Sequence, residues 1–428
     1  MGKERCRRHG GRRLVSGLEV TFSCPRCDFR GGLDAWFLGC PECRRHGQIS
    51  VLEAAYPADA LPLEAPFGTA RDGFWGYASR LPVPDAASRL TLGEGNTPLV
   101  RSRRIGMSLG LPELMFKCEG ANPTLSFKDR YAAVTVSVAK SLGFKKVVVS
   151  STGNYGAAVA AYAAVAGLTC VVLCADGVPP LVLAQIIHYG GEPVVIKGPD
   201  RFSLVEYLVT EHGWFPAGLF LETPVHNPFG VEGYKTIAWE IVRDLGDVPD
   251  AVVFPCARGN GLYGAWKGFR DLLELGVIGR LPRMIACQPA GAATIEASLK
   301  TGAPVRLTPS PSVGVSINEE QASVRAVDAV RESGGAGVSV SDEAALAASR
   351  SLGAEGLWAE VSSAFALAGV EQLTETGNLN EDMRVVVVLT GSGAKWGVEA
   401  DPFAPTVSRI HGTAAELEAC LAEMGISL

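Results

Sequence analysis

The residues Val147-Val-Val-Ser-Ser-Thr-Gly-Asn-Tyr-Gly156 form a short apolar run that passes directly into small polar residues. Such a run predicts a buried strand, then a tight turn, then the first turn of a helix. Backbone N–H groups at a helix N-terminus hold anions well, because they have no partners within the helix. We therefore expect this turn to bind an anion such as a carboxylate through Ser151, Thr152, Gly153 and Asn154.

The same order of strand, small polar turn and helix occurs further along the chain. Residues 251–254 lead into the glycine-rich stretch 255–264, and residues 384–389 lead into Thr390-Gly-Ser-Gly-Ala394. Short Val-rich strands that alternate with helices are typical of α/β proteins with parallel sheets, and here they predict two sheets with a cleft between them. The expected strands are 114–118, 146–150, 168–174, 193–196, 251–254, 284–287 and 384–389, and the expected helices are 129–142, 155–166, 181–189, 202–212 and 263–275.

A lysine stands at the predicted start of one of these helices, in Asn122-Pro-Thr-Leu-Ser-Phe-Lys128-Asp-Arg130. Beside the apolar Phe127, Lys128 can be desolvated enough to act as a nucleophilic amine, although a lysine at a helix start is more often a solvated surface charge. Ligands of open α/β sheets bind at the carboxyl ends of the strands. This rule places Lys128, Asn154, Gly259 and Thr390 at one cleft.

The turn after residue 254 has two interpretations. A glycine-rich turn at a helix N-terminus fits a phosphate. Gly259-Asn-Gly-Leu-Tyr-Gly264 also matches the G-x-G-x-x-G pattern of dinucleotide-binding proteins, which would indicate an NAD-dependent oxidoreductase. Against this second interpretation, the next strand ends at Gln288, where an acidic residue for the ribose is expected.

Four of the eleven cysteines form two C-x-x-C pairs separated by twelve residues. This spacing is typical of a zinc ribbon, in which four thiolates bind one structural Zn²⁺ and leave no open position for catalysis. Cys6, His9 and His46 are alternative ligands, but we expect them to be surface residues. The predicted ligands are Cys24, Cys27, Cys40 and Cys43.

Charge is distributed unevenly over the 428 residues. Residues 1–50 hold 10 Lys and Arg against 5 Asp and Glu, whereas the rest of the chain has a net charge of −11. The main body is therefore a poor candidate for nucleic-acid binding. The apolar stretch 157–175 is interrupted by Gly167 and Thr169, so we expect no membrane span. An odd number of cysteines and an Arg-rich N-terminus favour a cytoplasmic protein with reduced thiols.

Composition predicts three parts of the chain. Residues 1–53 are the zinc-ribbon-like module, residues 54–90 are a Pro- and Ala-rich connecting arm, and residues 91–428 are the main body. Within the body we expect a smaller sub-domain at about 140–225, inserted in the larger one. The Gly- and Ser-rich residues 333–341 are expected to form a mobile loop near the cleft.

Taken together, these motifs resemble the fold-type II (tryptophan synthase β-like) pyridoxal-phosphate (PLP) enzymes, and within them the threonine synthases. The resemblance runs from about Cys24 to Ala394 and implies two parallel-sheet α/β domains with a PLP cleft between them. It also implies a homodimer and, in some members, a zinc ribbon at the N-terminus. The motifs that carry it are Gly93-Glu-Gly-Asn-Thr-Pro-Leu99, Asn122 to Arg130, Ser151-Thr-Gly-Asn154, Trp266-Lys-Gly-Phe269 and Thr390-Gly-Ser-Gly393.

The resemblance assigns roles to individual positions. Lys128 is implied to form a Schiff base with PLP and later to move protons. Asn154 is implied to meet the phenolic oxygen of the cofactor, and Thr390 its pyridine nitrogen. The turn from Ser151 to Asn154 then takes the substrate carboxylate. The turn from Ala257 to Gly261 is implied to hold the cofactor phosphate, with Arg258 adding a charge. The full set implied to bind the cofactor is Lys128, Phe127, Asn154, Ala257, Arg258, Gly259, Asn260, Gly261 and Thr390.

Two departures from the family pattern bear on the substrate. Leu125 stands where the family usually has Gly. The segment 225–236 resembles the family segment that binds the phosphate of the substrate. In it, Val225, Gly230 and Tyr234 stand where the family has Ser, Arg and Gln. His226 or Lys235 could supply the positive charge that the missing Arg would provide.

The resemblance therefore implies a PLP-dependent lyase or synthase that makes threonine from a substrate such as O-phosphohomoserine. The alternative is β-elimination or β-replacement on another amino acid, such as serine or phosphoserine, as in a dehydratase or a cysteate-synthase-like enzyme. A third possibility is a zinc-ribbon binding protein with an inactive enzyme body, but intact Lys128, Asn154 and Thr390 argue against it.

Overall fold

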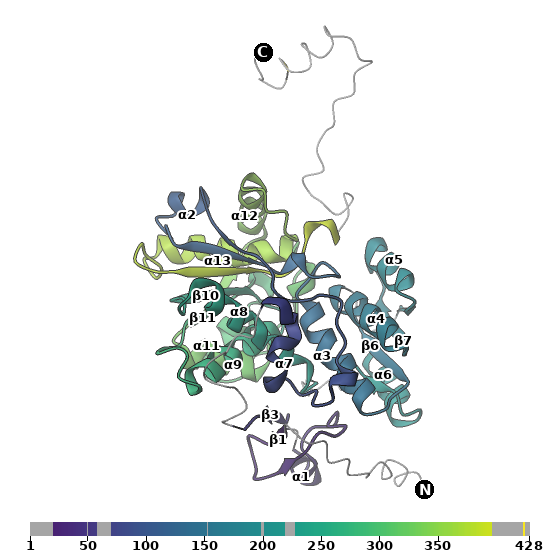
Figure 1. Ribbon diagram of the computed structural model, residues 1–428. Coiled ribbons are helices and arrows are strands. Elements are labelled where there is room, and N and C mark those ends of the chain that lie inside the picture. Colours follow the sequence, from purple (N-terminus) through teal and green to yellow (C-terminus); the bar gives the residue numbers. More distant parts are fainter. Residues whose placement is uncertain are drawn as a thin grey trace. The chain divides into compact units, whose positions relative to one another are not determined.

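The computed structural model describes residues 20–48, 50–57, 70–151, 153–197, 201–218, 227–395 and 423. Its regular elements alternate between strands and helices over most of this range (Figure 1). The strands are β1 Thr21–Ser23, β2 Arg30–Gly31, β3 Glu53–Ala55, β4 Leu99–Arg101, β5 Leu114–Cys118, β6 Lys146–Ser150, β7 Thr169–Ala175, β8 Glu192–Ile196, β9 Phe215–Pro216, β10 Ala251–Pro255, β11 Arg283–Pro289, β12 Ala336–Val340 and β13 Val385–Leu389. The α-helices are α1 Pro41–Arg45, α2 Ile105–Ser108, α3 Lys128–Ser141, α4 Asn154–Ala166, α5 Pro180–His188, α6 Arg201–Thr210, α7 Gly230–Gly233, α8 Lys235–Leu245, α9 Asn260–Glu274, α10 Thr294–Thr301, α11 Val324–Glu332, α12 Asp342–Ala354 and α13 Val361–Glu375, and the longest 3₁₀ segment is η1 Ala70–Arg80.

The larger sheet has six strands in the order β12-β11-β10-β13-β5-β4, all parallel except β4. Its central strands β10 and β13 are buried at every residue, because helices cover both faces. Val253 and Val387 pack with α12 and α13 on one face. Val252 and Val386 pack with α8, α9 and α11 on the other face.

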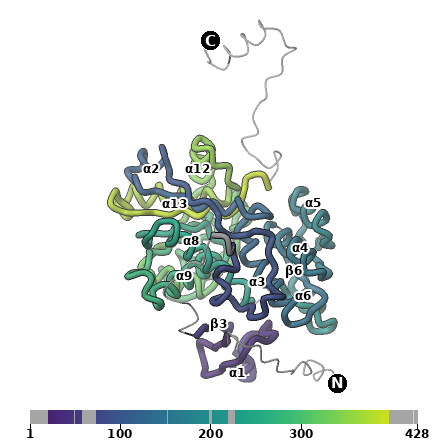
Figure 2. The backbone as a smooth tube through the Cα atoms, in the orientation of Figure 1, coloured from purple at the N-terminus to yellow at the C-terminus, as the bar shows by residue number. Residues whose placement is uncertain are grey.

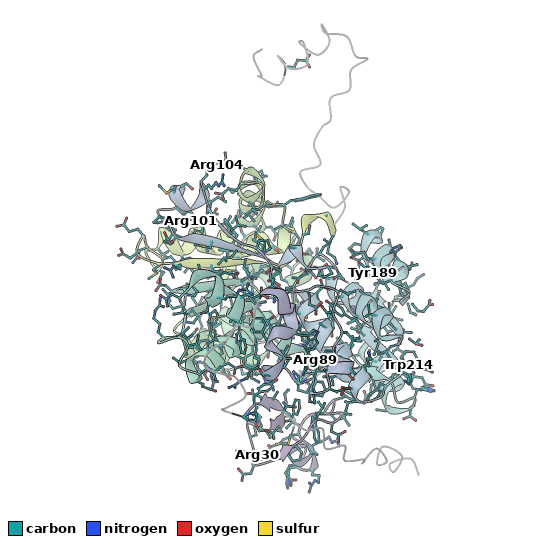
Figure 3. The ribbon with its side chains drawn as sticks, viewed as in Figure 1. Arg30, Arg89, Arg101, Arg104, Tyr189 and Trp214 are labelled. Carbon is teal, nitrogen blue, oxygen red and sulfur yellow. The ribbon has the colours of Figure 1, made fainter. Side chains whose placement is uncertain are left out.

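The smaller sheet has four parallel strands in the order β8-β7-β6-β9. Helices α4, α5 and α6 surround it in the teal part of Figure 1. Trp214, labelled in Figure 3, lies beside this sheet, with the centre of its ring 5.3 Å from Nζ of Lys146. The expectation of an α/β fold with two parallel sheets is confirmed.

The N-terminal module is a three-stranded antiparallel sheet, β2-β1-β3, with the short helix α1, and it is the purple part of the tube in Figure 2. Its sheet continues to Ala55, which pairs with Thr21. The module packs on the body through aromatic rings, because Phe22 lies 5.3 Å from Phe229 between ring centroids and Phe37 lies 4.8 Å from Phe215. These contacts give the small module an apolar base on the larger body.

One expectation was wrong. Residues 333–341 contain strand β12, which pairs with β11 at the edge of the larger sheet, rather than a mobile loop. Val338 and Val340 are buried there against the core of α12 and α13. These two apolar residues at a spacing of two face the core, and pairing with β11 holds the segment as a strand despite the flanking Gly and Ser.

No helix in the described part of the chain combines the length and the apolar character needed to cross a membrane.

A fully buried ionic network holds the start of α3. The guanidinium of Arg130 donates to both oxygens of Glu119 at 2.7 and 2.8 Å, and to both oxygens of Glu240 at 2.6 and 2.7 Å. Lys117 donates to the same Glu240 at 2.8 Å, and all four residues have no solvent exposure. The backbone N–H of Asn96 also donates to Glu240, so the loop before β4, strand β5, α3 and α8 meet at these groups.

We expect Arg130→Ala to lower the free energy of unfolding by about 3–5 kcal/mol, because two buried carboxylates lose their shared partner. Arg331→Ala is the matched control, since Arg331 is 49% exposed and pairs with Asp328 on the same helix. Urea unfolding of both variants measures the difference, and the control should change by less than about 0.5 kcal/mol. Equal stability of the two variants would show that the network contributes nothing.

Candidate functional site

The segment before Lys128 is tied to the end of β13. The N–H of Phe127 donates to the carbonyl of Thr390 at 2.9 Å, and the N–H of Ser392 donates to the carbonyl of Leu125 at 3.0 Å. Lys128 is the first residue of α3. The lysine and Thr390 are therefore brought together, as expected for groups at the carboxyl ends of strands.

Leu125 lies in this segment with φ of 66°, in the left-handed region. Glycine adopts this conformation freely, whereas for other residues it costs about 1–2 kcal/mol. The backbone thus has the shape that the family's usual Gly would favour, and the chain keeps it with a leucine.

Apolar surroundings weaken the charge of Lys128. Its Nζ lies 4.2 Å from the centre of the Phe127 ring, and that ring stacks on Tyr234 at 5.0 Å. Desolvation lowers the pKa of Lys128 to about 8, although the carboxylates of Glu360 and Glu319 act in the opposite direction. A larger fraction of the amine is therefore neutral, and able to act as a nucleophile, than in an ordinary lysine.

Glu360 joins the two polar residues expected at the ring of the cofactor. Its buried carboxylate accepts a hydrogen bond from Nδ2 of Asn154 at 2.9 Å and another from Oγ1 of Thr390 at 3.3 Å. Asn154 follows β6 of the smaller sheet and Thr390 follows β13 of the larger sheet. The carboxylate therefore bridges the two sheets at the position where the sequence predicted a ligand.

Sequence analysis missed Glu360. It directly precedes α13, and an acidic residue at a helix start is usually solvated, so its type and position carry no signal of burial. The nearby Ser363 also escaped notice, although its Oγ lies 3.0 Å from Oγ1 of Thr390.

Two observations show that these residues fit a phosphate-bearing aromatic cofactor. Oδ1 of Asn154 is buried without a hydrogen-bond partner in the described part of the chain, and such an atom calls for a ligand. The turn before α9 leaves no room for side chains. A Cβ on Gly259, which has φ of 85°, would lie 2.4 Å from Cβ of Ala326, and one on Gly261 would lie 2.6 Å from the Phe127 ring. The two glycines thus let this turn pack closely against Phe127 and Ala326 at the N-terminus of α9, where unpaired backbone N–H groups suit a phosphate.

The other predicted site residues have more varied surroundings. The guanidinium of Arg258 pairs with Glu319 at 3.1 Å, so its charge is already balanced. Oγ of Ser151 accepts hydrogen bonds from the N–H groups of Gly153 and Gly156 at 3.3 and 3.0 Å, which shapes the turn at the start of α4. Thr152 lies outside the described residues.

The segment that departs from the family pattern is tightly packed. A Cβ on Gly230 would lie 2.2 Å from the Tyr131 ring and 2.3 Å from Oγ1 of Thr135. Nζ of Lys235 is buried and pairs with Asp271 at 2.8 Å and Glu232 at 3.0 Å. Lys235 is therefore already engaged by two carboxylates, while Val225 and His226 lie outside the described residues.

The four predicted zinc ligands form one cluster in the N-terminal module. All four Sγ atoms lie within 4.8 Å of one another, and the Cys24–Cys43 and Cys27–Cys40 separations are 3.6 and 3.5 Å. Sulfur atoms on one tetrahedral Zn²⁺, with bonds of about 2.3 Å, lie about 3.8 Å apart. The N–H of Arg26 points at Sγ of Cys24, and the N–H of Cys43 points at Sγ of Cys40. This donor set fits one tetrahedral zinc.

Comparisons with known proteins agree with the geometry. The family described as "Pyridoxal-phosphate dependent enzyme" matches residues 90–391. The chain belongs to the family of pyridoxal-phosphate dependent enzymes. Threonine synthase of Methanocaldococcus jannaschii is 37% identical over 332 residues, covering 76% of this chain and 80% of the relative. Threonine synthase of Methanosarcina acetivorans is 35% identical, covering 87% of each chain.

Among solved structures, a threonine deaminase from T.th. superimposes with a TM-score of 0.58 and 26% identity, covering 70% of this chain and 92% of that one. The chain is thus a threonine synthase-like PLP enzyme with an amino-acid substrate, and the resemblance seen in its sequence is confirmed. The NAD-dependent interpretation of Gly259 to Gly264 has no support from these relatives.

The pKa of Lys128 leads to a pH prediction. The neutral amine reacts with PLP, so the rate of reconstitution of the apoenzyme should rise about tenfold per pH unit and level off above about pH 8. Glu360→Gln removes a carboxylate that raises this pKa, so the midpoint should move to lower pH. Stopped-flow absorbance measures the rate, with the exposed Glu375→Gln on α13 as control. A midpoint near 10.5 in the wild type would contradict the desolvated lysine.

Loss of zinc should destabilise the N-terminal module and leave the PLP site intact. We expect one zinc per chain by metal analysis, and we expect Cys43→Ser to lose it and to lower Tm by several degrees. The visible absorbance of bound PLP should remain, because the cysteine cluster shares no residue with the site around Lys128. Cys118→Ser, outside the cluster, serves as the control. If the wild-type protein binds no zinc and is still fully stable, the assignment of a zinc site is wrong.

Proposed function

We propose that the chain converts O-phosphohomoserine and water to threonine and phosphate with PLP as its cofactor. The observation that carries this proposal is the desolvated Lys128 beside the Asn154–Glu360–Thr390 bridge, in a chain whose relatives are named threonine synthases. When bound, PLP withdraws electrons from the substrate and makes its Cα proton acidic.

In this proposal, Lys128 holds the cofactor and then takes and returns protons at the substrate. A pKa of about 8 suits both directions of transfer near neutral pH. The N–H groups from Ala257 to Gly261 hold the cofactor phosphate, and the turn at Ser151, Thr152 and Gly153 holds the substrate carboxylate. Phe127 packs against the lysine and excludes water from it.

Glu360 acts as a positioning residue. Its carboxylate accepts hydrogen bonds from both the Asn154 amide and the Thr390 hydroxyl, which fixes the orientation of each side chain. Asn154 keeps a second amide hydrogen, which would serve the phenolic oxygen of bound PLP, and Thr390 would hold the ring nitrogen.

A second function is favoured by the packing of segment 227–236. Gly230 has no space for a guanidinium and Lys235 is engaged by two carboxylates, so neither grips a substrate phosphate. A substrate with a smaller or neutral leaving group, such as serine, needs no positive charge at these two positions. The alternative is therefore β-elimination or β-replacement on a serine-type amino acid.

We further propose that the protein is a cytoplasmic homodimer. The homodimer rests on the family resemblance alone. The cytoplasmic location rests on the thiol chemistry, because none of the nine described cysteines forms a disulfide.

Turnover assays on the holoenzyme separate the two functions. With O-phospho-L-homoserine we expect phosphate and threonine in equal amounts, and with L-serine or O-phospho-L-serine no pyruvate. Pyruvate from the serine substrates without threonine would establish the alternative. Lys128→Ala should lose at least about 100-fold in kcat under either function, whereas Lys140→Ala on the same helix should keep it. Wild-type turnover in Lys128→Ala would contradict both functions.

A further inference from the structure

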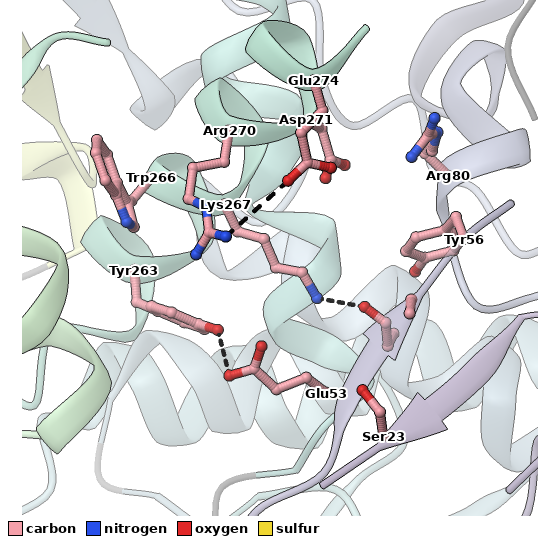
Figure 4. Close-up of a pocket in the computed structure, with 12 residues that line it drawn as sticks. Ser23, Glu53, Tyr56, Arg80, Tyr263, Trp266, Lys267, Arg270, Asp271 and Glu274 are labelled. Atoms are coloured by element: carbon pink, nitrogen blue, oxygen red, sulfur yellow. Dashed lines mark hydrogen bonds and ion pairs between the residues drawn. The ribbon is translucent and has the colours of Figure 1, made fainter. Parts of the chain in front are cut away.

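A cavity of about 220 Å³ lies where the N-terminal module, the segment η1 and helix α9 meet (Figure 4). Its wall includes Glu53 and Tyr56 from the module end, Arg80 from η1, and one face of α9. None of the residues assigned to PLP or to its substrate belongs to this wall. A cavity of this size has room for several waters or for a small metabolite.

Arg80 is the unusual group in this wall. Its side chain belongs to a residue that is only 4% exposed, and its Nε is buried with no hydrogen-bond partner in the described part of the chain. A buried guanidinium with an unpaired N–H is costly, and its fork of donors matches a carboxylate. The residue thus marks a place for an oxyanion.

The rest of the wall limits which oxyanion fits. Arg80, Lys267 and Arg270 are balanced by an equal number of acidic residues, so the wall has no net formal charge and does not favour a dianion. Lys267 is already held by Glu232 at 2.6 Å, and Glu274 lies 4.0 Å from Arg270 through Oε1. Asp271 binds Lys235 through Oδ2 at 2.8 Å. Figure 4 shows the acidic side chains of Asp271 and Glu274 on α9 at the same end of the cavity as Arg80. Arg80 and the other oxygen of each carboxylate, at one end of the cavity, suit a molecule whose ammonium and carboxylate groups are attached to the same carbon.

We propose that this cavity binds a free α-amino acid, with its carboxylate on Arg80 and its ammonium on Asp271 and Glu274. The aromatic rings of Tyr56, Tyr263 and Trp266 then receive the side chain. This site is additional to the one that holds PLP and goes beyond the proposed function. Its test does not depend on turnover.

Thermal unfolding of the holoenzyme tests the proposal with glycine, L-threonine, L-aspartate and L-lysine as probes, and with acetate and inorganic phosphate as anion controls. Visible absorbance is recorded in the same samples, because an amino acid that reaches PLP changes its spectrum. We expect at least one amino acid to raise Tm by a few degrees at about 100-fold excess over Kd without changing the spectrum.

Two variants locate the binding. Arg80→Gln should weaken the apparent affinity about tenfold or more, because a charge-assisted hydrogen bond is lost. Arg89→Gln is the matched control, since Arg89 follows η1, is labelled in Figure 3 and donates to the carbonyls of Val83 and Pro84 outside the cavity. If Arg80→Gln does not fold, Glu274→Gln replaces it. Glu274 is 64% exposed, so its loss should leave the fold intact and weaken binding a few-fold.

Several results would overturn the proposal. One is that no amino acid raises Tm, or that each one that does so also changes the spectrum. Another is that acetate or phosphate stabilises the protein as well as any amino acid, which would indicate a simple anion site. A third is unchanged affinity in Arg80→Gln or, where that variant does not fold, in Glu274→Gln.

Discussion

The buried guanidinium of Arg130 is the constraint on which the site depends. It forms paired hydrogen bonds with Glu119 after β5 and with Glu240 on α8, so it fixes the rotation of α3 about its own axis. Lys128 is two residues earlier on the same helix, and its direction follows from that rotation. Buried ion pairs often add little net stability, because desolvation offsets their attraction. The value of this network therefore lies in position, and only the planar fork of arginine can serve two carboxylates in this way.

The same buried network also joins sequence motifs that lie far apart in the chain. Gly95 donates to the side chain of Asn122, Asn96 and Thr97 donate to Glu240, and Thr97 also donates to Glu119. The stretch from Gly93 to Leu99 thus has a structural task beside the lysine rather than a chemical one. This stretch is one of the motifs that carry the family resemblance, and its structural task is to give the buried carboxylates hydrogen-bond donors.

Much of the fold follows from local pattern, and the site follows from a rule about strand ends. Val147 to Val149 and Val385 to Val388 are unbroken apolar runs, which only buried parallel strands accommodate. The meeting of Lys128, Asn154 and Thr390 could be predicted because each follows or adjoins such a strand. Glu360 could not, because its burial depends on two partners about 30 and 206 residues away. Strand β12 was missed for a related reason, since its pairing with β11 overrides the local preference of Gly and Ser.

Helix α9 connects two sites that the sequence gives no reason to associate. Its first residue, Asn260, belongs to the turn assigned to the cofactor phosphate, and Asp271 and Glu274 in its last turns line the cavity beside Arg80. Lys267, midway between them, pairs with Glu232, and Tyr234 two residues later stacks on Phe127 next to the lysine. A ligand that moves or stiffens α9 therefore acts on the phosphate turn and on the ring beside Lys128 at the same time. Coupling between two sites is reciprocal. If the ligand in the cavity tightens the binding of PLP, then PLP tightens the binding of that ligand by the same factor.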